Sequence, residues 1–176
     1  TQLARSWGAD AALVVVPYYN KPSQKGLLAH YEAIANEGGL PIVLYNVPSR
    51  TITKLDLQTI RDLSKNPRVV AIKEASGDLN FGREITESTS LLLLSGDDGT
   101  CLRLAGSGGL GVISVVSHLI PKELVRMMKS ATQAASQGMG AIETIAKEFD
   151  FKYGELNSSL YVEANPIPVK YALYRM

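Results

Sequence analysis

A lysine at the end of an apolar stretch is the side chain in this sequence with the clearest chemical potential. Four apolar residues, 69–72, lead directly into Lys73, which is the pattern of a short buried strand. One interpretation is that the strand ends before Lys73 and that the lysine turns into solvent, as most lysines do. The other is that burial lowers the pKa of Lys73, so that its neutral amine can attack a carbonyl carbon.

Three tyrosines stand at or just beyond the ends of predicted strands. Tyr18 and Tyr19 follow the apolar run 11–16, and Tyr45 ends the run 41–45. A phenol donates and accepts through one oxygen, so three phenols near a lysine are suited to a proton relay. The alternative is that each tyrosine only packs a loop, which is the commoner role for one tyrosine alone.

Arg50 lies in the loop 46–51, which Pro48 stiffens. Its planar guanidinium can hold a carboxylate through two parallel hydrogen bonds. The alternative is a surface arginine, or one that forms a salt bridge with a neighbouring loop. The choice depends on whether the ends of these strands come together in the fold.

The glycine-rich segment 106–111 matches the G-x-G-x-x-G pattern of dinucleotide-binding loops. That pattern needs a strand before it and a helix after it, whereas the strand-like run 111–115 follows these glycines. We therefore expect the glycines to allow tight entry of the chain into a strand rather than to bind a nucleotide.

The other candidate sites are weaker. Asp97 and Asp98 are adjacent, so their side chains point apart, and helix capping is favoured over a cation site. His30 and His118 stand far apart and outside any zinc-ligand spacing. Cys101 has no partner in a recognisable catalytic arrangement and is interpreted as a buried thiol. The sequence predicts no metal and no cofactor.

The elements that must position these residues alternate along the chain. Strands are expected at 11–16, 41–45, 69–73, 91–95 and 111–115. Helices are expected before Gly8, from an N-cap at Ser23 to Gly38, through 55–63, around 81–86, briefly before the last strand, and at 124–135, 141–149 and after Pro166. Strand–loop–helix units repeated in this way are the pattern of an α/β fold with a parallel sheet.

Two architectures fit five such units: an open doubly wound sheet and part of a barrel. The candidate residues follow the carboxyl ends of the strands, and those ends form the active face of a (β/α)8 barrel. A complete barrel needs about 250 residues. We therefore expect a (β/α)8 TIM barrel that lacks about its first three βα units. Residues 1–120 would form the C-terminal part of the barrel, and residues 121–176 an incomplete helical C-terminal region.

Composition places the chain among ordinary globular proteins. It has 176 residues, is 45% hydrophobic and 20% charged, and carries a net charge of +1. This balance gives no argument for nucleic acid or an anionic membrane as a partner. One cysteine excludes an internal disulfide, and no apolar run approaches the length of a membrane span. A cytoplasmic protein is expected. Both ends of the chain lie within helical patterns, so we expect it to continue in both directions.

Two segments carry a resemblance to a known family. Residues 45–51 read Tyr-Asn-Val-Pro-Ser-Arg-Thr, and Lys73 follows 28 residues after Tyr45 in Ile-Lys-Glu-Ala-Ser-Gly. Together they resemble the dihydrodipicolinate synthase family of Schiff-base lyases. Supporting matches occur in the family's order at residues 17–23, 94–98, 111–115 and 165–170.

The resemblance implies a lyase of lysine and diaminopimelate biosynthesis that condenses pyruvate with L-aspartate-4-semialdehyde. By this resemblance Lys73 forms the Schiff base with pyruvate, and Tyr45 and Tyr19 move protons, Tyr19 in a neighbouring subunit's site. Arg50 holds the carboxylate of the semialdehyde.

The resemblance also implies that the backbone at Gly96 and Ile113 lines the pyruvate end of the site. Tyr18 would lie at a feedback site for L-lysine between subunits of a homotetramer, a dimer of dimers. The family's Gly-Thr-Thr-Gly-Glu segment, which contributes threonines to the site, would precede Thr1.

Two alternatives remain at this point. A sialate lyase or keto-deoxy-sugar-acid aldolase would share the barrel and the Schiff-base lysine, although Arg50 argues against it. A catalytically silent barrel used for binding would share the fold alone.

Overall fold

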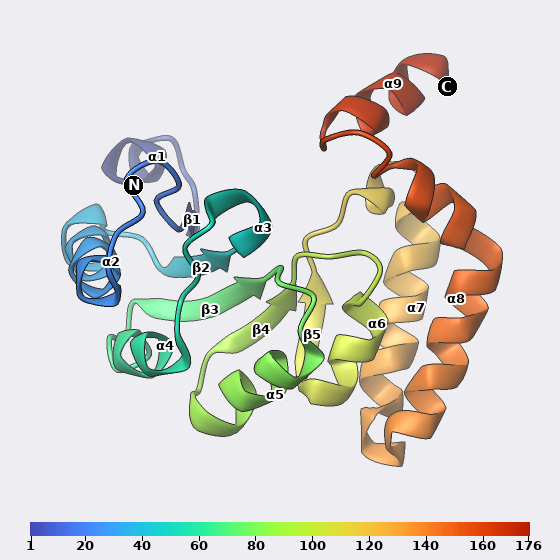
Figure 1. Ribbon diagram of the computed structural model, residues 1–176, viewed down its shortest axis with the longest axis horizontal. Coiled ribbons are helices and arrows are strands. Elements are labelled where there is room, and N and C mark those ends of the chain that lie inside the picture. Colours follow the sequence, from blue (N-terminus) through green and yellow to red (C-terminus); the bar gives the residue numbers. More distant parts are fainter. The chain divides into compact units, whose positions relative to one another are not determined.

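The computed structural model describes residues 1–176, which divide into two compact units, Thr1–Leu94 and Ser95–Met176. The strands form one five-stranded sheet in the order β1-β2-β3-β4-β5 (Figure 1). The β1–β2 and β2–β3 pairs are parallel. The predicted α/β class is confirmed. The boundary predicted at residue 120 stays a prediction.

The first unit alternates strands with helices. Its elements are α1 (Gln2–Ser6), β1 (Ala12–Val15), α2 (Gln24–Gly38), β2 (Ile42–Asn46), α3 (Pro48–Thr51), α4 (Leu57–Leu63), β3 (Val69–Glu74), α5 (Leu79–Ser88) and β4 (Leu92–Ser95), whose last residue opens the second unit. All four strands predicted for this part of the chain are present. The segment 46–51, predicted as a loop, instead contains the short helix α3, which Pro48 begins at a position where its missing N–H costs nothing.

Local sequence signals explain where the helices of this unit begin and end. Ser23 is the N-cap of α2, and its hydroxyl accepts a hydrogen bond from the Gly26 N–H at 3.2 Å, as predicted. Gly39 ends the helix in the left-handed conformation, with φ of 73°. Asp78 caps α5 by accepting from the N–H groups of Asn80 and Phe81.

The second unit is mainly helical. Its elements are α6 (Cys101–Leu104), the 3-10 helix η1 (Ala105–Ser107), β5 (Gly109–Val112), η2 (Val116–His118), α7 (Pro121–Ala134), η3 (Ala135–Gln137), α8 (Met139–Ser159) and α9 (Ile167–Arg175). Helices α7 and α8 lie side by side (Figure 1). Their apolar faces close a core with α6 that includes Leu124, Met127 and Phe149.

The glycine-rich segment leads into a strand, as predicted. Gly108 adopts φ of 85°, which favours glycine, and β5 begins at Gly109. A Cβ on Gly109 would lie 2.8 Å from the carbonyl oxygen of Leu104, so only glycine fits there without a shift of the backbone. The strand starts two residues earlier than the predicted range 111–115, because these glycines belong to the strand as well as to the turn.

The pairing of β2 with β3 contains a register shift. Ile42 pairs with Val69, but Val43 pairs with Ala71, so one residue of β3 is passed over. Side chains alternate between the two faces of a strand, so a shift of one residue decides which of them are neighbours. The shift brings Tyr45 into register with Lys73.

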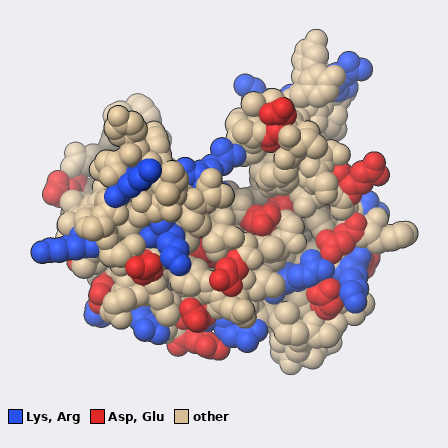
Figure 2. Space-filling model, in the orientation of Figure 1, with Lys and Arg blue, Asp and Glu red and all other residues tan.

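The surface carries charges of both signs. On the face drawn in Figure 2, Lys and Arg side chains are interspersed with Asp and Glu side chains. Within the second unit, Arg103 of α6 forms salt bridges to Glu143 and Asp150 of α8 at 2.9 and 2.8 Å. None of the helices combines the length and the apolar character that crossing a membrane requires.

A strained turn follows Arg50. Ile52 has φ of 63° and ψ of −49°, and the Thr53 N–H donates to the Thr51 carbonyl at 2.7 Å, which closes a positive-φ γ-turn. This conformation is sterically unfavourable for a β-branched residue and raises the free energy of the folded state. The Ile52 side chain is 69% exposed, so its burial contributes little stabilising free energy to offset that cost.

Replacing Ile52 with glycine is expected to stabilise the protein. Relief of the strain, less the entropy that glycine adds to the unfolded chain, gives a net gain of about 1 kcal/mol. Thermal unfolding of the full-length protein should show a midpoint raised by about 2–4 °C. Ile52→Ala is the matched control, because it keeps the Cβ that causes the strain and should give no gain. A lower midpoint for Ile52→Gly would contradict the strain argument.

Candidate functional site

Lys73 and Tyr45 form the centre of the candidate site. They occupy paired positions on the neighbouring parallel strands β3 and β2. The Nζ atom of Lys73 lies 4.2 Å from the centre of the Tyr45 ring, and Lys73 is only 8% exposed. The interpretation of Lys73 as a solvated strand end is therefore wrong, and its expected burial facing Tyr45 is confirmed.

The contact between Lys73 and Tyr45 is a cation–π interaction, in which the electron-rich face of the ring attracts the lysine head group. The contact holds the Nζ atom of Lys73 beside the Tyr45 phenol at the ends of β3 and β2. A lysine placed in this way can act as a nucleophile toward a carbonyl carbon when its amine is neutral.

A buried hydrogen-bonded pair lies at the next register position. Asn46 of β2 and Glu74 of β3 are 0% and 3% exposed, and the Asn46 Nδ2 donates to Glu74 Oε2 at 2.7 Å. The Glu74 Oε1 accepts from the Ser76 N–H at 2.5 Å, and Asn46 Oδ1 accepts from the Leu55 N–H at 3.0 Å. The pair thus fixes the ends of both strands directly beyond Tyr45 and Lys73.

Burial raises the pKa of the Glu74 carboxyl, and the hydrogen bonds from Ser76 and Asn46 oppose that effect. Neither Asn46 nor Glu74 is among the site residues predicted from the sequence. The available signal was a carboxylate directly after Lys73 in an apolar strand, since a buried carboxylate requires a partner.

Arg50 lies on α3, beyond the end of β2, and is exposed. Burial raises the pKa of the Tyr45 phenol, and the positive charge of Arg50 lowers it in part. Arg50 and Tyr45 are thus electrostatically coupled within the first unit. A guanidinium can bind a carboxylate through two parallel hydrogen bonds.

Removing the charge of Arg50 should raise the pKa of Tyr45 further. In Arg50→Met the burial effect remains while the opposing positive charge is gone. Absorbance titration of the phenolate, taken as the difference from the same protein carrying Tyr45→Phe, measures this pKa. Tyr45 should ionise at a higher pH in Arg50→Met than in wild type. An unchanged or lower pKa would contradict the coupling.

Tyr18 and Tyr19 follow β1 and are 66% and 92% exposed. Lys73, in contrast, is buried against the ring of Tyr45. Their predicted roles, at a subunit boundary and in a neighbouring subunit's site, both require exposed side chains. Those roles stay predictions.

Gly96 and Ile113 lie in the second unit. The Ile113 N–H donates to the carbonyl oxygen of Ser95 at 2.9 Å, so the backbone after β5 is tied to the residue that precedes Gly96. Ile113 is 39% exposed. The predicted role of both residues in holding pyruvate stays a prediction.

The interpretation of Asp97 and Asp98 as caps of the following helix is wrong. The N-cap of α6 is Thr100, and no side chain caps that helix. Asp97 Oδ1 accepts from the Gly99 N–H within its own turn. Asp98 is buried and accepts from the N–H groups of Val115 and Val116, because its position beside that loop lets it satisfy backbone donors 17 and 18 residues away.

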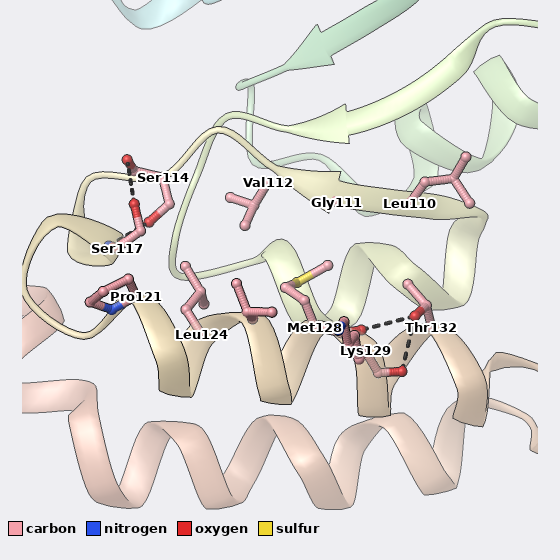
Figure 3. A pocket seen from close by; sticks show the side chains of 11 residues that line it. Leu110, Gly111, Val112, Ser114, Ser117, Pro121, Leu124, Met128, Lys129 and Thr132 are labelled. Carbon is pink, nitrogen blue, oxygen red and sulfur yellow. Dashed lines mark hydrogen bonds between the residues drawn. The ribbon is translucent and has the colours of Figure 1, made fainter.

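A cavity of about 280 Å³ lies between β5 and α7 in the second unit (Figure 3). Its walls are mainly apolar and include Val112, Leu124 and Met128. The hydroxyl of Thr132 is directed back to the carbonyls of Met128 and Lys129 rather than to a ligand. Ser114 and Ser117 also line the cavity and are hydrogen-bonded to each other, and Lys129 is the one charged residue among the lining residues. The structure contains no group of three or more His, Cys, Asp or Glu residues arranged to hold a metal ion.

Comparisons with known proteins agree on one family. The model of the dihydrodipicolinate synthetase family matches residues 1–176. The 4-hydroxy-tetrahydrodipicolinate synthase of Bdellovibrio bacteriovorus is 49% identical over 175 residues, which are 98% of this chain and 57% of that relative. The chain thus spans little more than half the length of the relatives that it matches.

Solved structures show the same similarity. The chloride-inhibited dihydrodipicolinate synthase of Acinetobacter baumannii, complexed with pyruvate, has a TM-score of 0.87 and 40% identity over 98% of this chain and 57% of its own. The enzyme of Cyanidioschyzon merolae with lysine bound has a TM-score of 0.87 and 41% identity over 97% of this chain and 57% of its own.

Proposed function

The chain belongs to the dihydrodipicolinate synthetase family, and from this premise we propose that the protein condenses pyruvate with L-aspartate-4-semialdehyde to give 4-hydroxy-tetrahydrodipicolinate. The proposed reaction belongs to the biosynthesis of diaminopimelate and lysine. The observation that carries the proposal is a buried lysine amine held over a tyrosine ring at the ends of two parallel strands.

The chemistry follows from the residue types. The neutral amine of Lys73 attacks the keto carbon of pyruvate, and loss of one water leaves an iminium ion. The iminium withdraws electrons, so that a proton leaves the methyl group and an enamine forms. The enamine carbon then adds to the aldehyde carbon of the second substrate, whose oxygen takes up a proton. The amino group of that substrate finally displaces Lys73 as the ring closes.

Each remaining residue has a proposed role in these steps. Tyr45 transfers protons next to Lys73, and burial supports this role because it keeps the phenol protonated at neutral pH. Tyr19 completes the relay in a neighbouring subunit, for which its exposed side chain is suited. Arg50 holds the carboxylate of aspartate semialdehyde. The backbone at Gly96 and Ile113 binds pyruvate.

The proposed architecture is a (β/α)8 barrel of which this chain forms five strands. Residues 1–120 would belong to the barrel and residues 121–176 to the helical C-terminal region. The TM-scores of the solved relatives support this assignment. No metal and no cofactor enter the proposed mechanism.

The proposed assembly is a cytoplasmic homotetramer built as a dimer of dimers, with L-lysine as a feedback inhibitor near Tyr18. The relative from Cyanidioschyzon merolae was solved with lysine bound, which supports the inhibitor. Another structural neighbour is a monomeric dihydrodipicolinate synthase variant. Light scattering of the full-length protein tests the tetramer, and turnover measured with and without L-lysine tests the inhibitor.

Trapping with borohydride tests the reaction itself. The full-length protein is incubated with pyruvate and sodium borohydride, digested and analysed by mass spectrometry. Reduction of the iminium by hydride should leave a stable 1-carboxyethyl group on the Nζ atom of Lys73 alone. Turnover with aspartate semialdehyde, compared with sugar acids, then identifies the second substrate. Absence of an adduct at Lys73 would refute the proposed function.

A further inference from the structure

A buried carboxylate in the second unit accepts three hydrogen bonds on one oxygen. Asp98 is 2% exposed, and its Oδ2 atom accepts from the N–H groups of Val115 and Val116, both at 2.9 Å. The phenol of Tyr161 donates to the same oxygen at 3.0 Å. Burial and the neighbouring charge of Asp98 raise the pKa of this phenol, so it stays a hydrogen-bond donor at neutral pH.

These three bonds join segments that are distant in sequence. Asp98 belongs to the turn that contains Gly96, Val115 belongs to the loop that contains Ile113, and Val116 begins η2 directly after that loop. Tyr161 follows the end of α8. The carboxylate therefore holds the two pieces of backbone for which pyruvate binding is proposed against the end of a long helix.

The loop after β5 is also braced from within. The Ser117 N–H donates to the Ser114 hydroxyl at 2.9 Å, and the Ser117 hydroxyl donates to the Ser114 carbonyl at 3.3 Å (Figure 3). Residues 113–118, which include η2, are thus held together by hydrogen bonds of their own. Their attachment to the turn at Gly96 depends on Asp98 and on the hydrogen bond from the Ile113 N–H to the Ser95 carbonyl. Movement of Asp98 would shift the loop as a whole.

We propose that Asp98 and Tyr161 are positioning residues that set the spacing of the pyruvate-binding backbone at Gly96 and Ile113. This inference rests on the proposed function. Neither side chain needs to touch the substrate. Asp98 acts by holding the donors of the loop, and Tyr161 acts by fixing the carboxylate in the orientation that reaches both of them.

The other oxygen of the carboxylate provides a conservative variant. Asp98 Oδ1 is buried and has no hydrogen-bond donor. In Asp98→Asn the amide oxygen can take the place of Oδ2 and keep all three donors, while the amide nitrogen takes the place of the oxygen that accepts none. Asparagine should therefore preserve the attachment in weaker form, because neutral acceptors bind less strongly than charged ones. Asp98→Ala should remove all three of these hydrogen bonds and leave only the bond from the Ile113 N–H to Ser95.

Steady-state kinetics of the full-length protein test the proposal. Each lost hydrogen bond corresponds to a factor of about five in affinity. The KM for pyruvate should therefore rise about tenfold or more in Asp98→Ala and about two- to fivefold in Tyr161→Phe. Asp98→Asn should restore most of the loss. The KM for aspartate semialdehyde should stay within about twofold of wild type, because Arg50 is proposed to bind that substrate. Tyr174→Phe, at a side chain that is 83% exposed, is the matched control.

The outcomes separate this inference from the proposed function. No adduct at Lys73 in wild type would refute the proposed function itself. An adduct in wild type, together with an unchanged pyruvate KM in both Tyr161→Phe and Asp98→Ala, would overturn the positioning role. A lower thermal midpoint without a pyruvate-specific change in KM would also overturn it. If Asp98→Ala does not fold, Tyr161→Phe and Asp98→Asn still decide the question.

Discussion

Replacing Lys73 with methionine is expected to abolish the condensation while leaving the fold intact. Methionine has a similar length and an apolar stem, so it should fill the space over the Tyr45 ring. It has no amine, so no Schiff base can form. Loss of a covalent nucleophile should lower kcat by at least about 10³-fold. Coupled turnover assays measure kcat, and borohydride trapping with pyruvate should give no adduct.

The stability of the Lys73→Met variant provides an independent check. An ammonium group at a site that is 8% exposed is partly removed from water, and this costs free energy that methionine does not incur. The thermal midpoint should therefore stay at the wild-type value or rise. Lys54→Met, at an exposed position of the same unit, is the matched control and should keep both activity and adduct. Retained turnover in Lys73→Met would remove Lys73 from the mechanism.

The strands and most helices could be predicted from the sequence, because apolar periodicity and capping residues act locally. Ser23, Gly39 and the apolar run before Lys73 each indicate their element through neighbours within a few residues. The burial of Lys73 could not be read from its own segment. It became an expectation because several polar residues follow strand ends that meet at one edge of a parallel sheet, and because the spacing of Tyr45 and Lys73 resembles that of a known family.

The contacts that sequence reasoning missed depend on geometry between distant segments. Lys73 is paired with Tyr45 because the register of β2 and β3 shifts by one residue between Ile42 and Val43. No residue type in either strand predicts that shift. Asp98 resembles a helix cap in sequence, yet its partners lie 17, 18 and 63 residues away. Hydrogen bonds between residues so far apart in the sequence are determined by tertiary packing and not by local conformational propensity.

The hydrogen-bonded pair Asn46–Glu74, directly beyond Tyr45 and Lys73, is expected to contribute strongly to the stability of the folded protein. In Glu74→Met the buried Asn46 Nδ2 loses its acceptor, and in Asn46→Leu the Leu55 N–H loses its acceptor and Glu74 loses a donor. Breaking a buried, charged hydrogen-bonded pair on one side costs about 3 kcal/mol. Denaturant unfolding of each single variant of the full-length protein should show this loss. Activity should fall too, because Tyr45 and Lys73 directly precede the two residues.

A double-mutant cycle tests whether the two side chains act together. Once either partner is gone, removing the other leaves fewer buried groups unpaired, so the double variant should lose about 1–3 kcal/mol less than the sum of the single losses. Gln58 and Asp62 provide the control, because they form the same amide–carboxylate bond, at 3.2 Å, on the exposed face of α4. The cycle of Gln58→Met and Asp62→Leu should show coupling of only about 0.5 kcal/mol. Equal coupling energies in both cycles would mean that burial does not strengthen the Asn46–Glu74 bond. The positions of the ends of β2 and β3 would then be fixed by strand pairing in the sheet alone.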